Sequence, residues 1–148
     1  MDEYFMKIAL DEALKAFEED EVPIGAVVVR EREIIAKAHN LRESLNDPTA
    51  HAEIIAIREA AEKLSSWRLI DCNLYVTIEP CPMCAGAIVQ SRIKRLIYGA
   101  KDPKAGAVDS VLSLVDNPNL NHSVEVTSGI LQYECSNIMK EYFRGKRK

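Results

Sequence analysis

Residues 72–90, CNLYVTIEPCPMCAGAIVQ, predict a buried strand that runs directly into a helix. The first eight residues form a short run rich in apolar and β-branched side chains, which is typical of a strand buried on both faces. The remainder favours a helix that begins at or near Cys81. A strand that passes into a helix in this way is the repeating unit of an α/β fold.

The rest of the chain continues this alternation after an initial hairpin. Residues 24–30 and 33–40 are β-rich and separated by two polar residues, which indicates an antiparallel pair. Thr49 is the predicted N-cap of the helix that follows. The other predicted elements are helices 2–19, 50–64 and 130–144 and strands 94–100 and 124–128. We expect one domain over residues 1–148, a three-layer α/β/α sandwich with a five-stranded mixed sheet in which the two central strand–helix units are parallel.

Composition places the chain among globular proteins, since 47% of its 148 residues are apolar and 28% are charged. No apolar run approaches the roughly 20 residues of a membrane span. The acidic N-terminus lacks the features of a signal peptide, so we expect a cytoplasmic protein without a membrane partner. The net charge of −4 hides a basic second half, because residues 90–148 carry 10 Lys and Arg against 6 Asp and Glu. That half either contacts phosphates or is a solvated end.

Cys81 and Cys84 have a spacing that serves both zinc sites and redox-active thiol pairs. In a reducing cytosol such a pair is more often metal-binding or catalytic than a structural disulfide. The stretch TAHAE, residues 49–53, favours a metal, because it places His51 in the first turn of another predicted helix. Helix starts converge at the carboxyl ends of strands in an open α/β sheet, which would bring one imidazole and two thiols together.

One histidine and two cysteines leave the fourth position of a tetrahedral zinc site open, as in catalytic rather than structural sites. Glu53 follows His51 by two residues and is near enough to move protons to and from a zinc-activated water. We therefore predict a catalytic zinc centre with Glu53 as its general acid and base.

Two motifs resemble those of known enzymes. HAE at 51–53 and PCPMC at 80–84 are similar to the paired signature of the zinc nucleobase deaminases. VPIGAVVV, AHNLRE, DPTAHAE and YGAKDPKAGA, among other stretches, narrow the resemblance to the bacterial tRNA-specific adenosine deaminases, over residues 4 to 144. The resemblance implies a cytidine-deaminase-like fold and hydrolytic conversion of the wobble adenosine of a tRNA anticodon to inosine, mainly in an arginine tRNA with anticodon ACG.

The resemblance also assigns roles to residues. It implies that His51, Cys81 and Cys84 hold one Zn2+ per subunit of a homodimer, and that Glu53 protonates N1 of the flipped-out adenine and then the departing amine. The substrate-binding residues that we expect are Asn40, the backbone of Ala52, Val27, Ile78, Lys101, Asp102, Lys104, Tyr142, Phe143 and Arg144. Core packing is an equally good account of Val27 and Ile78. The last three residues, Lys146 to Lys148, would contact phosphates together with Arg144.

Three other functions stay open from the sequence. The first is a zinc deaminase of a free base or nucleotide, such as guanine, cytidine or deoxycytidylate. The second is a zinc-stabilised binding module without activity, and the third is a redox protein without metal. The expected macromolecular partner is a tRNA anticodon stem-loop, and no DNA partner is expected.

Overall fold

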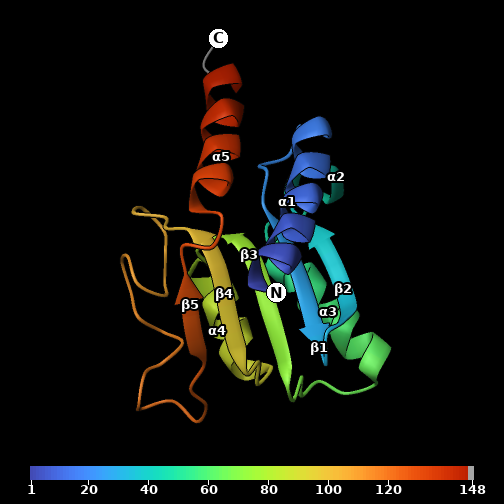
Figure 1. Cartoon of the computed structure of the whole chain (residues 1–148), viewed down its shortest axis with the longest axis vertical. Coiled ribbons are helices and arrows are strands. Elements are labelled where there is room, and N and C mark those ends of the chain that lie inside the picture. Colours follow the sequence, from blue (N-terminus) through green and yellow to red (C-terminus); the bar gives the residue numbers. More distant parts are fainter. Residues whose placement is uncertain (147–148) are drawn as a thin grey trace.

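The computed structural model describes residues 1–146, and within them the central layer is a mixed five-stranded sheet in the order β2-β1-β3-β4-β5 (Figure 1). β1 pairs antiparallel with both β2 and β3, whereas β3, β4 and β5 are parallel. The strands are β1 Gly25–Arg30, β2 Glu33–His39, β3 Cys72–Ile78, β4 Arg95–Ala100 and β5 Glu125–Ser128. The predicted hairpin and mixed sheet are confirmed.

Helices cover both faces of this sheet (Figure 1). α1 and α5 lie against one face, and α3 and α4 pack against the other. The helices are α1 Asp2–Glu18, α2 Arg42–Leu45, α3 Ala52–Leu64, α4 Pro82–Gln90 and α5 Gln132–Lys146. The predicted three-layer α/β/α sandwich is therefore confirmed. In the described residues 1–146, no helix is long and apolar enough to cross a membrane.

Each face of the sheet has its own core because successive strand residues point to opposite sides. Val28 and Val76 belong to the core under α3 and α4. Val27 and Tyr75 belong to the core under α1. Gly25 lets α1 approach the sheet closely, since a Cβ at this position would lie 1.9 Å from the carbonyl oxygen of Ala9.

The start of α3 differs from the prediction. The helix begins at Ala52 with His51 as its N-cap, and Thr49 lies outside it. The hydroxyl and the backbone N–H of Thr49 both donate to Asp47 Oδ1, each over 2.8 Å. Thr49 is therefore not the N-cap, because the turn after Asp47 engages its side chain.

Among the three parallel strands β3, β4 and β5, only β3 and β4 are joined by a helix, and the predicted elements likewise include none between β4 and β5. Residues 101–124 connect two parallel strands without a helix, and several of their backbone N–H groups bond to the carboxylate of Glu79 instead. The single turn α2 was also not predicted. α5 extends two residues beyond the prediction, and Arg147 and Lys148 lie outside the described residues.

Candidate metal centre and active site

His51, Cys81 and Cys84 meet beyond the carboxyl end of β3. His51 is the N-cap of α3, Cys81 is the N-cap of α4, and Cys84 lies in the first turn of α4. His51 Nδ1 is 3.6 Å from Cys81 Sγ and 3.5 Å from Cys84 Sγ. The structure thus brings together the three residues that the sequence predicted as ligands, because the N-terminal ends of α3 and α4 lie next to each other.

The donor set of this cluster fits a zinc ion. One imidazole nitrogen and two sulfurs lie within 4.8 Å of one another, close enough to coordinate a single ion. His51 and Cys81 also line a cavity, so the fourth coordination position would face open space. A hydrogen bond from Cys84 lowers the pKa of the Cys81 thiol to about 4, although burial opposes this shift. Sulfur that is already ionised is the form that binds a metal.

Glu53 occupies the second position of α3 and is only 3% exposed. Its burial raises the pKa of the carboxyl to about 7. Glu53 lines the same cavity as His51 and Cys81. A buried carboxyl beside three potential metal ligands, at the wall of a substrate-sized cavity, is suited to proton transfer.

The cavity has a volume of about 1050 Å³ and combines an apolar floor with a basic rim. Its apolar lining includes Val22, Ile24, Ile78, Ala100 and Met139. Its basic lining residues, which we call the basic rim, are Arg42, Lys101, Lys104, Lys140 and Arg144. A space of this size accepts a nucleobase with part of its sugar–phosphate backbone, and the rim would attract its phosphates.

Six of the predicted substrate-binding residues line this cavity. They are Ile78, Lys101, Asp102, Lys104, Phe143 and Arg144. The side chains of the other four do not line it. Val27 is fully buried in the core under α1, and Ala52 is buried at the first position of α3.

Asn40 is 4% exposed and its side chain is engaged by the local backbone. Its Oδ1 accepts a hydrogen bond from the backbone N–H of Arg42 over 3.2 Å. Its Nδ2 donates to the carbonyl of Val22 over 3.5 Å. A carboxamide has two donors and two lone pairs. Each end therefore keeps capacity for one further partner, and contact of Asn40 with a base remains a proposal.

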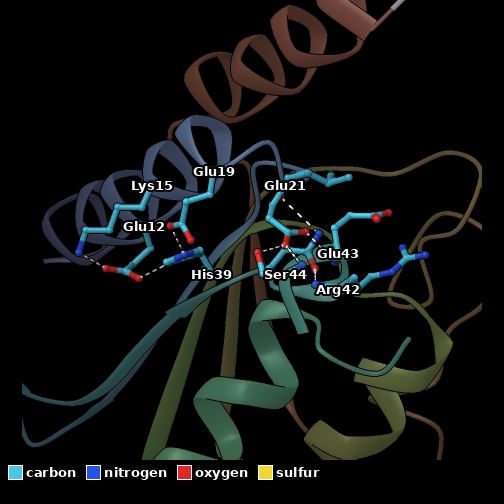
Figure 2. A network of polar contacts seen from close by, with 10 residues as sticks. Glu12, Lys15, Glu19, Glu21, His39, Arg42, Glu43 and Ser44 are labelled. Atoms are coloured by element: carbon cyan, nitrogen blue, oxygen red, sulfur yellow. Dashed lines mark hydrogen bonds and ion pairs between the residues drawn. The ribbon is translucent and has the colours of Figure 1, made fainter. Parts of the chain in front are cut away.

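A polar network holds the segment around Asn40 (Figure 2). His39 lies between two carboxylates, with 2.9 Å contacts to Glu12 and to Glu19. The buried carboxylate of Glu21 accepts from the backbone N–H groups of Glu43 and Ser44 and from the Ser44 hydroxyl. These contacts fix the end of β2 and the turn α2, which carries Arg42 to the cavity.

The adjacent aromatic residues Tyr142 and Phe143 of α5 occupy different environments. Phe143 lines the cavity and is 43% exposed. Tyr142 is only 9% exposed, because its ring packs edge-to-face on Phe17 and its hydroxyl donates to the carbonyl of Asp20. The structure thus places Phe143 where a base could stack and Tyr142 in the contact between α1 and α5.

Three charged residues of the site were missed from the sequence. Arg42 and Lys140 line the cavity, and the signal for Lys140 was its helical spacing of three and four residues from Phe143 and Arg144. Glu79 is 3% exposed and borders the cavity. Burial raises its pKa, but the Ser110 hydroxyl and several backbone N–H groups outweigh this and lower it to about 2. No motif pointed to this role of Glu79.

Comparison with known proteins identifies similar deaminases, both by sequence and by structure. A family model described as MafB19-like deaminase matches residues 1–147. A tRNA-specific adenosine deaminase of Bacillus subtilis is 51% identical over 147 residues, covering 99% of this chain and 91% of that protein. A solved structure from a study of A-to-I editing by tRNA:A34 deaminases at the wobble position has 51% identity and a TM-score of 0.88, covering 91% of this chain and 98% of the other.

A guanine deaminase of Bacillus subtilis is a more distant structural neighbour. It is 34% identical with a TM-score of 0.66, and the match covers 98% of this chain and 92% of that one. The fold and chain length are thus shared by enzymes described as acting on a tRNA and on a free base. The discriminating features must lie in the residues around the cavity.

Proposed function

We propose that this chain, which belongs to the MafB19-like deaminases and to the tRNA-specific adenosine deaminases, converts the wobble adenosine of a tRNA anticodon to inosine. The observation that carries this is the position of Glu53 beside the cluster of His51, Cys81 and Cys84, at the wall of a cavity with a basic rim. An arginine tRNA with anticodon ACG is the proposed main substrate.

His51, Cys81 and Cys84 would hold one zinc ion per subunit. When bound, zinc supplies Lewis acidity that brings the pKa of water toward neutrality. The reaction replaces the amino group at C6 of adenine by oxygen and releases ammonia. Glu53 takes a proton from the attacking water and delivers it to ring N1. It then takes the remaining proton from the new hydroxyl at C6 and delivers it to the departing amine, which leaves inosine with a C6 carbonyl and a protonated N1.

The rim of the cavity supports an RNA substrate. The exposed residues Arg42, Lys101, Lys104, Lys140 and Arg144 line the cavity, and a small neutral base would not require these positive charges. Phe143 offers an aromatic face on which an unpaired base can stack. Sequence-specific RNA binding usually targets single-stranded loops, whose bases stack on aromatic side chains and are hydrogen-bonded along their edges, while phosphate contacts position the RNA.

Three further properties belong to the same proposal. We infer that the enzyme works in the cytoplasm, where its tRNA is found. We also infer that it acts as a homodimer and that its RNA partner is the anticodon stem-loop. These proposals rest on the likeness to tRNA-specific adenosine deaminases and on the basic rim.

Deamination of free guanine is the second candidate function. It is favoured by the likeness to the guanine deaminase of Bacillus subtilis. The five basic residues at the rim argue against it, because a free base brings no phosphates for them to bind.

A direct comparison of substrates separates the two functions. Zinc-loaded protein is incubated with an ACG anticodon stem-loop and, in parallel, with free guanine, adenosine and cytidine, and the products are read by mass spectrometry. We expect a gain of about one mass unit in the stem-loop alone. Turnover of guanine with no change in the stem-loop would contradict the RNA substrate and retain the deaminase chemistry.

A further inference from the structure

Glu79 anchors the wall of the cavity that carries Lys101 and Lys104. We name residues 101–110 the rim loop; its first five residues line the cavity. Glu79 Oε1 accepts from the backbone N–H of Asp102 and from the Ser110 hydroxyl. Glu79 Oε2 accepts from the backbone N–H groups of Val108, Asp109 and Ser110, over 3.1, 2.8 and 2.9 Å. One carboxylate therefore holds both ends of the loop.

This arrangement differs from a salt bridge. Among the described residues 1–146, the ion pairs of the structure do not include Glu79, so its negative charge is balanced by the five donors of the rim loop. Hydrogen bonds to a charged acceptor are stronger than those between neutral groups. A buried carboxylate that lost these donors would be costly, so the loop and Glu79 hold each other in place.

The interior of the rim loop is shaped to this carboxylate. Gly106 packs directly on it, because a Cβ at that position would lie 2.3 Å from the carboxyl carbon of Glu79. Asp102 tightens the turn by accepting from the backbone N–H groups of Lys104 and Ala105. Ala107 N–H donates to the carbonyl of Pro80 over 2.8 Å, which ties the loop to the segment leading into α4.

We propose that Glu79 is a positioning residue for RNA binding: it holds the rim loop in the form that presents Lys101 and Lys104 to the substrate before the substrate arrives. This inference rests on the proposed function, since it takes the RNA to be what the loop meets. A loop ordered in advance loses less conformational entropy on binding, so its anchor acts on affinity. Glu79 adjoins the turn of Cys81 but is outside the cluster of His51, Cys81 and Cys84.

The test uses Glu79→Gln in the zinc-loaded full chain, with Asp2→Asn as a matched control. Asp2 is also a carboxylate with several partners, Tyr75 and Arg95, but it ties α1 to the sheet rather than to the rim loop. Glutamine keeps the size of Glu79 but turns an NH₂ group toward backbone donors. Ser110→Ala is the milder second variant, because it removes one donor and leaves the carboxylate in place.

Four measurements are made on each variant: amide hydrogen exchange, zinc content, the Kd for the stem-loop by fluorescence anisotropy, and kcat with KM. For Glu79→Gln we expect faster exchange at Asp102 and Val108 to Ser110, and a Kd and KM raised about tenfold, the loss expected from one or two such hydrogen bonds. Zinc content is expected to be unchanged and kcat to fall less than about threefold. Ser110→Ala should shift the same quantities less, and Asp2→Asn should leave Kd unchanged.

Two results would overturn the proposal. Unchanged exchange in the rim loop would show that Glu79 does not hold it. Loss of zinc and of kcat at constant Kd would show that Glu79 acts through Cys81 instead. If Glu79→Gln does not fold, Ser110→Ala decides by the same criteria. Failure of the wild-type protein to bind or deaminate the stem-loop is a separate outcome, which would overturn the RNA substrate itself while exchange still reports on the loop.

Discussion

Glu53 is a buried carboxyl two residues from His51, a proposed metal ligand, and its surroundings explain why it can transfer protons. Burial raises its pKa, so the carboxyl gives up and regains a proton more readily near neutral pH than an exposed glutamate. Its place in the first turn of α3 fixes its position relative to His51. The start of α3 therefore positions both the proposed metal ligand His51 and the proposed proton carrier Glu53.

Glu53→Gln is expected to abolish turnover while keeping the fold, the zinc content and RNA binding. Glutamine has the same shape but cannot carry the proton, so kcat should fall by at least roughly 10²–10⁴-fold. The measurements are single-turnover deamination, zinc content and stem-loop Kd. Activity within a few fold of wild type would remove Glu53 from the mechanism.

Cys84→Ala is expected to lose zinc, because the remaining imidazole and single thiol are too few for a stable zinc site. Zinc content by atomic absorption should fall far below one per chain, and activity should fall in parallel. Cys135→Ala is the matched control, since Cys135 is a buried cysteine in the core under α1. Full zinc occupancy in Cys84→Ala would contradict the proposed ligand set.

At the scale of elements, α5 both packs on α1 and lines the cavity: Tyr142 makes the contact with α1 and Phe143 lines the cavity. Phe143→Ala should weaken stem-loop binding by roughly 1–3 kcal/mol, the range for loss of one base-stacking platform, with little change in Tm. Tyr142→Ala should instead lower the free energy of unfolding by about 3 kcal/mol, because it empties the contact with Phe17.

Thermal unfolding and anisotropy on both variants check this division. The reverse result, with Tyr142→Ala weakening RNA binding at unchanged Tm, would show that Tyr142 contacts the RNA, as predicted from the sequence. Such a result would mean that α5 leaves α1 when RNA binds.

The N-terminal end of α1 is held to the sheet by Asp2, which predicts a pH dependence. Arg95 hydrogen-bonds Asp2 and lowers its pKa below the ordinary 3.8, although burial opposes this. A lowered pKa in the folded state means that this stabilisation is present above pH 3.8 and is lost as pH falls through the folded value. Asp2→Asn should therefore have a lower Tm than wild type at pH 7, and the gap should shrink below about pH 4. A gap that stays constant from pH 7 to pH 3 would contradict this account.

The elements that the sequence predicted are those whose pattern is local. The strand and helix of residues 72–90 follow from their own apolar residues. The turn α2 depends on Glu21, 23 residues upstream of Ser44, and the course of the rim loop depends on Glu79. Such distant partners leave no local signal. For the same reason the sequence could not say that Val27 faces the core under α1, or that Tyr142 faces Phe17.

For the whole molecule, the basic rim should dominate the salt dependence of RNA binding. Replacing Lys140 by Gln removes one cation of the cavity, so the slope of log K against log salt should decrease by about 0.7–1. Lys63→Gln is the control, because Lys63 lies in the last turn of α3, at the other end of that helix from His51. Equal slopes for wild type and Lys140→Gln would exclude a phosphate contact at Lys140.

The fold, the cluster of His51, Cys81 and Cys84 and the basic rim of the cavity all support the proposal that this chain edits a single adenosine of a tRNA. The most direct measurement is inosine mapping in a transcribed full-length arginine tRNA with anticodon ACG, after incubation with zinc-loaded protein. Reverse transcription reads inosine as guanosine at each position. We expect conversion at the wobble adenosine and at no other adenosine. No conversion there, or equal conversion throughout the tRNA, would contradict the account.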